Sequence, residues 1–121
     1  MIDPVASRTQ RIISYGPLRT IVEVIDKNWK PYADKPAITM TIRYTQYAGN
    51  RSTDVDVFFD KDVKDYLFST GIINVKESVE FSNKEGLRGC WGTDWPSSDH
   101  ENFKPETVGL GIWIPQQYIR S

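Results

Sequence analysis

The sequence predicts a small, mainly β protein: an antiparallel barrel of five to six strands with one short helix at about residues 61–70. Several runs of β-branched and aromatic residues alternate with polar residues and are separated by turn-forming residues, which is typical of strands. A single stretch has helical spacing instead. The length of 121 residues predicts one domain over 1–121, large enough to bury a core without disulfides.

The composition of the chain argues against some classes of function. Hydrophobic residues make up 39% of the chain and charged residues 26%, as in ordinary globular proteins, and the net charge is −1. This balance argues against a protein that binds nucleic acid by phosphate neutralisation alone. The single cysteine, Cys90, excludes an intrachain disulfide, and the N-terminus lacks the pattern of a signal peptide. We therefore expect a cytoplasmic protein without a membrane partner.

The clearest strand covers residues 37–47, where Ile38, Met40 and Ile42 alternate with polar residues and are expected in the core. Residues 48–50 (Ala-Gly-Asn) predict a hairpin turn. In the next strand, residues 52–59, alternation divides the side chains between two faces. The inward set is Val55, Val57 and Phe59, and the outward set is Asp54, Asp56 and Phe58.

Further strands are expected at residues 18–26, 72–82 and 107–115, and residues 11–14 and 87–91 are candidates for short strands. Residues 1–10 are interpreted as a loose lead-in. The proline-containing segments 27–36 and 92–106 are interpreted as loops, and the second is long enough to carry function. Gly109 and Gly111 are expected to mark a bulge or a bend in the last strand.

The helix is predicted from capping residues and spacing. Asp60 is a suitable N-cap, and Gly71 stands where a helix often ends. Val63, Tyr66, Leu67 and Thr70 lie between them at the spacing of one helical face.

Residues 37–89 resemble the central part of bacterial single-stranded-DNA-binding proteins. The shared features are a polar-faced hairpin, a strand ending in Val57-Phe58-Phe59, a helix containing Tyr66-Leu67, Gly71, and the strand that ends near Phe81. The resemblance implies an OB-fold, a Greek-key barrel with a helix between its third and fourth strands. It also implies that single-stranded nucleic acid is the ligand.

In such a module, bases stack on exposed aromatic rings while basic side chains follow the backbone. The candidate nucleic-acid-binding residues are aromatic or basic side chains on the hairpin face and in the flanking loops: Trp29, Tyr32, Arg43, Tyr47, Arg51, Phe58, Trp91 and Trp95. Phe81 and Trp113 lie in apolar strands and are expected in the core.

No set of residues predicts catalysis, a metal or a cofactor, so we expect a binding module rather than an enzyme. Asp54 and Asp56 are interpreted as a solvated strand face. Asp94, Asp99, His100 and Glu101 are interpreted as an acidic surface loop, because no second histidine and no paired cysteine accompanies them. Cys90 is expected to be a small buried residue.

Two other functions fit the sequence. A protein-interaction module, such as an inhibitor, an immunity protein or an assembly subunit, would use the aromatic-rich loops as an interface. A carbohydrate-binding β-sandwich would use Trp91 and Trp95 as platforms for sugar rings, and two facing sheets instead of one closed barrel would favour it. The sequence leaves a homo-oligomer open.

Overall fold

The computed structural model describes residues 4–73, 75, 77–95 and 98–119. The chain is mainly β and divides into two compact units, Met1–Leu67 and Phe68–Ser121. Part of the predicted lead-in (1–3), of the predicted strand 72–82 (74 and 76) and of the long loop (96–97) lies outside the described residues. No helix in the described ranges is long and apolar enough to cross a membrane.

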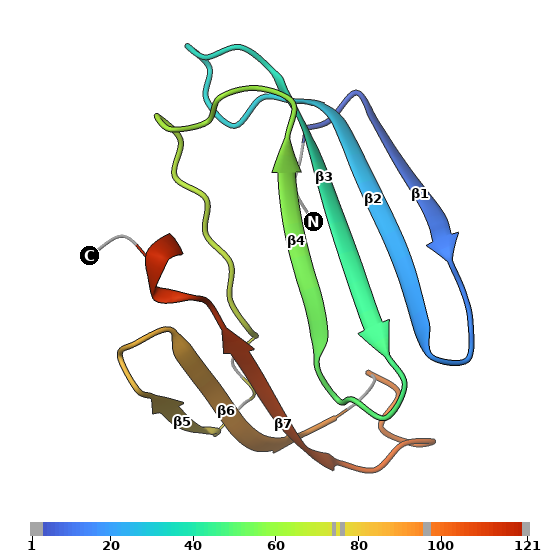
Figure 1. Ribbon diagram of the computed structural model, residues 1–121. Helices are drawn as coiled ribbons and strands as arrows, with labels where there is room; N and C mark the ends of the chain where they lie inside the picture. The colour runs from blue at the N-terminus through green and yellow to red at the C-terminus, as the bar shows by residue number, and fades with distance from the viewer. Residues whose placement is uncertain (1–3, 74, 76, 96–97, 120–121) are drawn as a thin grey trace. The chain divides into compact units, whose positions relative to one another are not determined.

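The first unit is a four-stranded antiparallel meander (Figure 1). Its strands are β1 (Ser7–Ser14), β2 (Arg19–Trp29), β3 (Ile38–Tyr47) and β4 (Thr53–Phe59). Consecutive strands pair with each other, and β1 and β4 are the two edges. The predicted turn at 48–50 is confirmed: Gly49 has a φ of 80°, a conformation that glycine adopts without strain.

The second unit is a three-stranded antiparallel sheet in the order β5 (Val79–Ser82), β6 (Leu87–Asp94) and β7 (Glu106–Trp113). A short 3₁₀ turn, η1 (Gln116–Tyr118), follows β7. At the β5–β6 turn, Gly86 has a φ of 102°, and a Cβ there would lie 2.1 Å from the carbonyl oxygen of Ile114. Only glycine fits this position without a backbone shift.

The predicted barrel is wrong, because the strands form two open sheets of four and three strands. Strands β1 and β4 do not pair with each other, so the first sheet keeps two edges. A barrel closes only when its edge strands pair. Among the described strands, no such pairing joins β1 to β4 or one sheet to the other.

The predicted helix at 61–70 is also wrong, because this segment is irregular, with a turn at residues 64–65. The carboxylate of Asp60 does not cap a helix: it accepts a hydrogen bond from the backbone N–H of Thr39, at 2.7 Å. Lys61 donates to the carbonyl of Ala37, and the Tyr66 hydroxyl donates to that of Pro36. These contacts with residues 36–39 hold the segment in an irregular conformation. Several residues of the segment have low helix propensity, so a helix is not strongly favoured over it.

Several boundaries differ from prediction because pairing with a neighbour extends a strand. Residues 7–10 belong to β1, since Ser7 to Gln10 pair with Lys27 to Val24 of β2. The loop predicted at 92–106 is shorter, because Thr93 pairs with Thr107 and Asp94 with Glu106. Among the described residues of the strand predicted at 72–82 (72–73, 75 and 77–82), only those of β5 belong to a sheet. The β6–β7 register is continuous through Gly109 and Gly111, so the expected bulge is wrong.

The two faces of the first sheet follow from its register, since directly opposed residues point to the same side. One face is apolar: the row Ile12, Val22, Tyr44 and Val55 crosses all four strands. Ile38 and Met40 lie on this face and are buried, as predicted, but Val55 is exposed. The opposite face is largely polar and carries Arg11, Glu23 and Arg43 as a second row.

A substitution at Met40 tests the core of the first sheet, because this side chain is only 1% exposed. We expect Met40→Ala to lower the free energy of unfolding by about 2–5 kcal/mol, from lost burial and the cavity left behind. Urea denaturation followed by circular dichroism measures this change. Val55→Ala on the same face should stay within about 0.5 kcal/mol of the parent, because Val55 is exposed. Equal losses for both variants would contradict the assignment of the core.

Candidate functional site

The eight predicted nucleic-acid-binding residues are divided between the two units. Six of them, Trp29 to Phe58, belong to the first unit, and Trp91 and Trp95 belong to the second. Within the first sheet, Arg43, Tyr47 and Phe58 lie on the polar face, as the register requires. Trp29 is not in a loop: it ends β2 opposite Ile38, which places it on the apolar face.

The other two residues of the first unit occupy separate places. Tyr32 contacts Tyr66 edge to face, with ring centroids 5.6 Å apart, and the ammonium group of Lys35 lies over both rings. This cluster joins the segment after β2 to the segment after β4. Arg51 is exposed in the β3–β4 turn.

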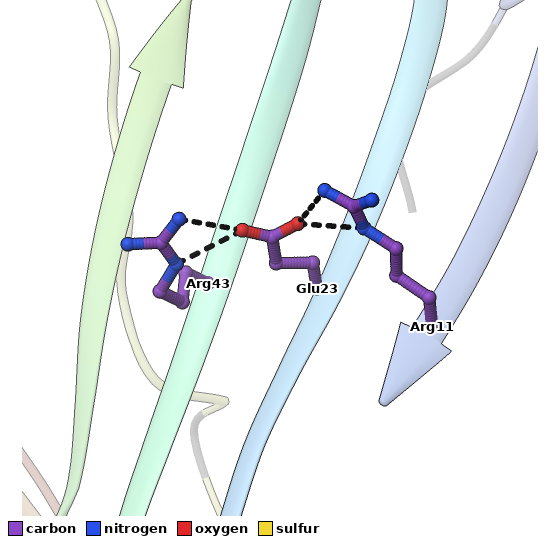
Figure 2. A network of polar contacts seen from close by, with 3 residues as sticks. All are labelled: Arg11, Glu23 and Arg43. Carbon is purple, nitrogen blue, oxygen red and sulfur yellow. Dashed lines mark hydrogen bonds and ion pairs between the residues drawn. The ribbon is translucent and has the colours of Figure 1, made fainter. Parts of the chain in front are cut away.

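Arg43 is occupied by an ion pair that sequence reasoning missed (Figure 2). Its Nε and Nη2 atoms donate to Glu23 Oε1 at 2.9 and 2.7 Å. Arg11 donates in the same way to Glu23 Oε2, at 2.9 and 2.7 Å. Strand pairing sets Arg11 and Arg43 on either side of Glu23, so one carboxylate binds two guanidinium groups.

The carboxylate of Glu23 is 2% exposed, and its pKa lies below the ordinary value of a glutamate. The hydrogen bonds from Arg43 and then Arg11 are the main causes, since they favour the charged form. Arg43 also stacks over the Phe58 ring, with its guanidinium carbon 5.1 Å from the centroid. This arrangement holds Arg43 in place and uses part of its hydrogen-bonding capacity.

A different surface emerges in the second unit, on one face of the β5–β7 sheet. We define the aromatic face by its apolar side chains, all of them exposed: Val79, Phe81, Leu87, Trp91 and Trp113. Phe81 is 58% exposed, Trp91 61% and Trp113 67%, so the expectation that Phe81 and Trp113 are core residues is wrong. The core of this unit lies on the opposite face, where Cys90 is buried, as predicted, and Gly92 packs against Val75 and Ser78.

Glycines lie between the aromatic rings on this face. Gly89 and Gly111 stand beside Phe81 in one cross-strand row, and Gly109 stands beside Trp91 in the next. A Cβ on Gly109 would lie 2.8 Å from Cε3 of Trp91, so the indole leans over this glycine. Beyond Trp91, the hydroxyl groups of Thr93 and Thr107 form a hydrogen bond of 2.8 Å with each other. The aromatic face therefore has large exposed rings, shallow gaps at the glycines between them, and hydroxyl groups at one end.

Trp95 lies in the loop after β6, where its indole stacks on the imidazole of His100 with ring centroids 4.1 Å apart. The nearby Asp99 accepts hydrogen bonds from Asn102, and they hold the pKa of its carboxyl below the ordinary value. In the part of the chain that the structure describes, no three His, Cys, Asp or Glu side chains gather closely enough to hold a metal ion.

A hollow of about 390 Å³ also lies in this unit, with the buried Cys90 in its lining. Its other lining residues are Ile72, Ile73, Glu80, Phe81, Ser82, Arg88 and Gly89. The thiol of Cys90 donates to the carbonyl oxygen of Ile73 at 3.5 Å. This contact and the burial of Cys90 suit a packing role.

Glu23 provides a test of the polar face. Glu23→Gln keeps the shape of the side chain but removes the charge that both arginines bind, so we expect a lower urea midpoint at neutral pH. The lowered pKa means that this stabilisation is complete above the pKa of an unfolded glutamate and is lost as the pH falls through the folded value. The difference between parent and variant should therefore shrink as the pH is lowered below about 4.

Asp54→Asn is the matched control, because it removes an exposed carboxylate from the same face. It should stay within about 0.5 kcal/mol of the parent at neutral pH. A Glu23→Gln variant as stable as the parent, or a difference that does not vary with pH, would show that the ion pair does not stabilise the sheet.

Comparison with known proteins gives one match. The model of a family described as "Domain of unknown function (DUF4861)" matches residues 1–121. No curated protein and no solved structure matches the chain.

Proposed function

Since the family model spans the whole sequence, the chain belongs to the DUF4861 family, and we propose that it is a non-catalytic module that binds carbohydrate on its aromatic face. The observation that carries this proposal is the exposure of Phe81, Trp91 and Trp113 on one face of a sheet whose buried residues, Cys90 and Gly92, lie on the other face. An aromatic ring offers a flat apolar surface against which the C–H face of a sugar ring can stack.

The glycines support a ligand that approaches the backbone closely. Gly89, Gly109 and Gly111 leave the sheet surface low between the rings, and glycine inside a strand is common where a ligand approaches. The row of Trp91 and that of Trp113 are four residues apart, or about 13 Å along the strands. That span is longer than one sugar ring, so an oligosaccharide should bind better than a monosaccharide.

The hydroxyl groups of Thr93 and Thr107 supply the polar contacts that a sugar needs at the edge of the face. The aromatic face lies on an open sheet and not on the wall of an OB-type barrel. In contrast with the sequence-based proposal, Trp95 is stacked on His100 and lies outside the aromatic face.

A protein partner is the second candidate function. Val79 is 74% exposed and Leu87 is also exposed, and both lie beside the aromatic rings. Aliphatic side chains of this kind are usual in the centre of a protein interface, and tryptophans often dominate its energetics.

Binding of single-stranded nucleic acid stays a prediction, with less support from the geometry. Arg43 is engaged by Glu23 and covered on one side by Phe58, which leaves fewer donors for phosphate groups. The candidate aromatics are divided between the two compact units. Titration with a labelled dT oligomer at low salt tests this function, since the interaction is strongest there.

Affinity electrophoresis in gels containing soluble plant, algal or bacterial polysaccharides tests the proposed function. We expect the parent chain to be retarded by at least one of them. Trp91→Ala should weaken binding at least tenfold, or about 1.4 kcal/mol, because it removes the central ring. Gly109→Ala should also weaken binding, because its Cβ would displace the Trp91 indole.

Tyr118→Ala is the control, since Tyr118 is an exposed aromatic residue of the same unit in η1 and outside the sheet. It should leave retardation unchanged. Lack of retardation by every polysaccharide, or equal losses for Trp91→Ala and Tyr118→Ala, would reject carbohydrate binding on this face.

A further inference from the structure

Two turns lie side by side at one end of the β1–β4 sheet (Figure 1). They are residues 15–18, between β1 and β2, and residues 48–52, between β3 and β4; we call them the paired turns. The backbone N–H of Ala48 donates to the carbonyl of Leu18 at 2.9 Å and joins them. Within the second turn, the Gln46 side chain donates to the carbonyl of Asn50 at 2.7 Å. The pair is therefore held as one structure.

Large apolar side chains project from this end. Tyr15 is 84% exposed and Leu18 is 77% exposed, although both lie in the first turn. Further exposed apolar residues flank the turns on the adjoining strands, with Ile12, Tyr44 and Val55 on the apolar face of the sheet and Tyr47 on the polar face. Exposed apolar residues that lie close together, as Tyr15 and Leu18 do in one short turn, mark an interaction site more often than isolated ones do.

The charges around the paired turns are mainly positive. Arg19 directly follows the first turn and Arg51 lies in the second, and both are exposed. Neither forms an ion pair with another residue in the described ranges. Asp54 is the nearby acidic residue on β4, whereas the whole chain has a net charge of −1. Positive charge is thus concentrated where the apolar side chains project.

We propose that the paired turns bind the surface of an anionic lipid bilayer. Tyr15 and Leu18 enter the boundary between the headgroups and the acyl chains, and Arg19 and Arg51 bind lipid phosphate and carboxylate groups. Apolar insertion combined with basic side chains is how proteins attach to such surfaces without crossing them. Tyrosine suits this boundary, because its ring is apolar and its hydroxyl is polar.

The size and shape of this surface favour lipid over a protein partner. A stable protein interface buries about 800 Å² on each side and uses about 20–30 residues. The paired turns are two short connections at the end of a sheet, so they form a small projecting surface. A bilayer accepts such a projection without a complementary hollow.

Co-sedimentation with phosphatidylcholine vesicles, with and without phosphatidylserine, tests this proposal. We expect the chain to bind the vesicles that contain phosphatidylserine and to dissociate as salt is raised. The double variant Tyr15→Ser/Leu18→Ser should bind at least tenfold more weakly. Arg19→Gln should bind about fivefold more weakly, the factor expected for one basic side chain at an anionic surface.

Leu67→Ser is the matched control, because Leu67 is a similarly exposed leucine of the same unit, outside the paired turns. It should bind vesicles like the parent, and thermal unfolding should show that all variants are folded. Absence of binding to phosphatidylserine vesicles at low salt would overturn the proposal. So would an equal loss in Leu67→Ser, or self-association that Tyr15→Ser/Leu18→Ser abolishes without any lipid binding. Polysaccharide retardation should not change in the turn variants, so this proposal and the proposed function fail independently.

Discussion

The carboxylate of Glu23 links three strands of the first sheet. It is nearly inaccessible to solvent and binds one guanidinium group from each neighbouring strand, Arg11 on β1 and Arg43 on β3. A buried carboxylate without such partners is strongly unfavourable. A slip of one residue in either pairing would move Glu23 or its partner to the other face, so the ion pairs fix the register of three strands together.

The register in turn decides what each face can do. With Glu23 on the polar face, Val22 and Val24 necessarily point to the apolar face, together with Tyr44 and Ile42. Asp26 also lies on that face, where Arg8 binds it at 2.5 Å, and so a second ion pair fixes the same register of β1 on β2. Ion pairs on opposite faces therefore fix the register of the first sheet even though few of its apolar side chains are buried.

The sequence predicted correctly the features that depend on a few neighbouring residues, such as strand alternation and a tight turn. Alternation placed Ile38 and Met40 in the core, and the turn at 48–50 follows from Gly49. The helix at 61–70 failed because Asp60, a good N-cap, found a backbone partner on β3 instead. The ion pair between Glu23 and Arg43 could not be predicted for a related reason. It depends on the register of β2 on β3, which places the two residues opposite each other and which the sequence alone does not give.

The aromatic face, by contrast, left a signal in the sequence. Gly89 and Trp91 are two residues apart, as are Gly109, Gly111 and Trp113, and a period of two puts each set on one face of its strand. Pairing then sets glycines of β7 beside the larger side chains of β6 and β5. A sheet face packed in a protein interior would fill such gaps, because interiors are close-packed. Rings alternating with gaps instead suit a surface whose contacts come from outside the sheet.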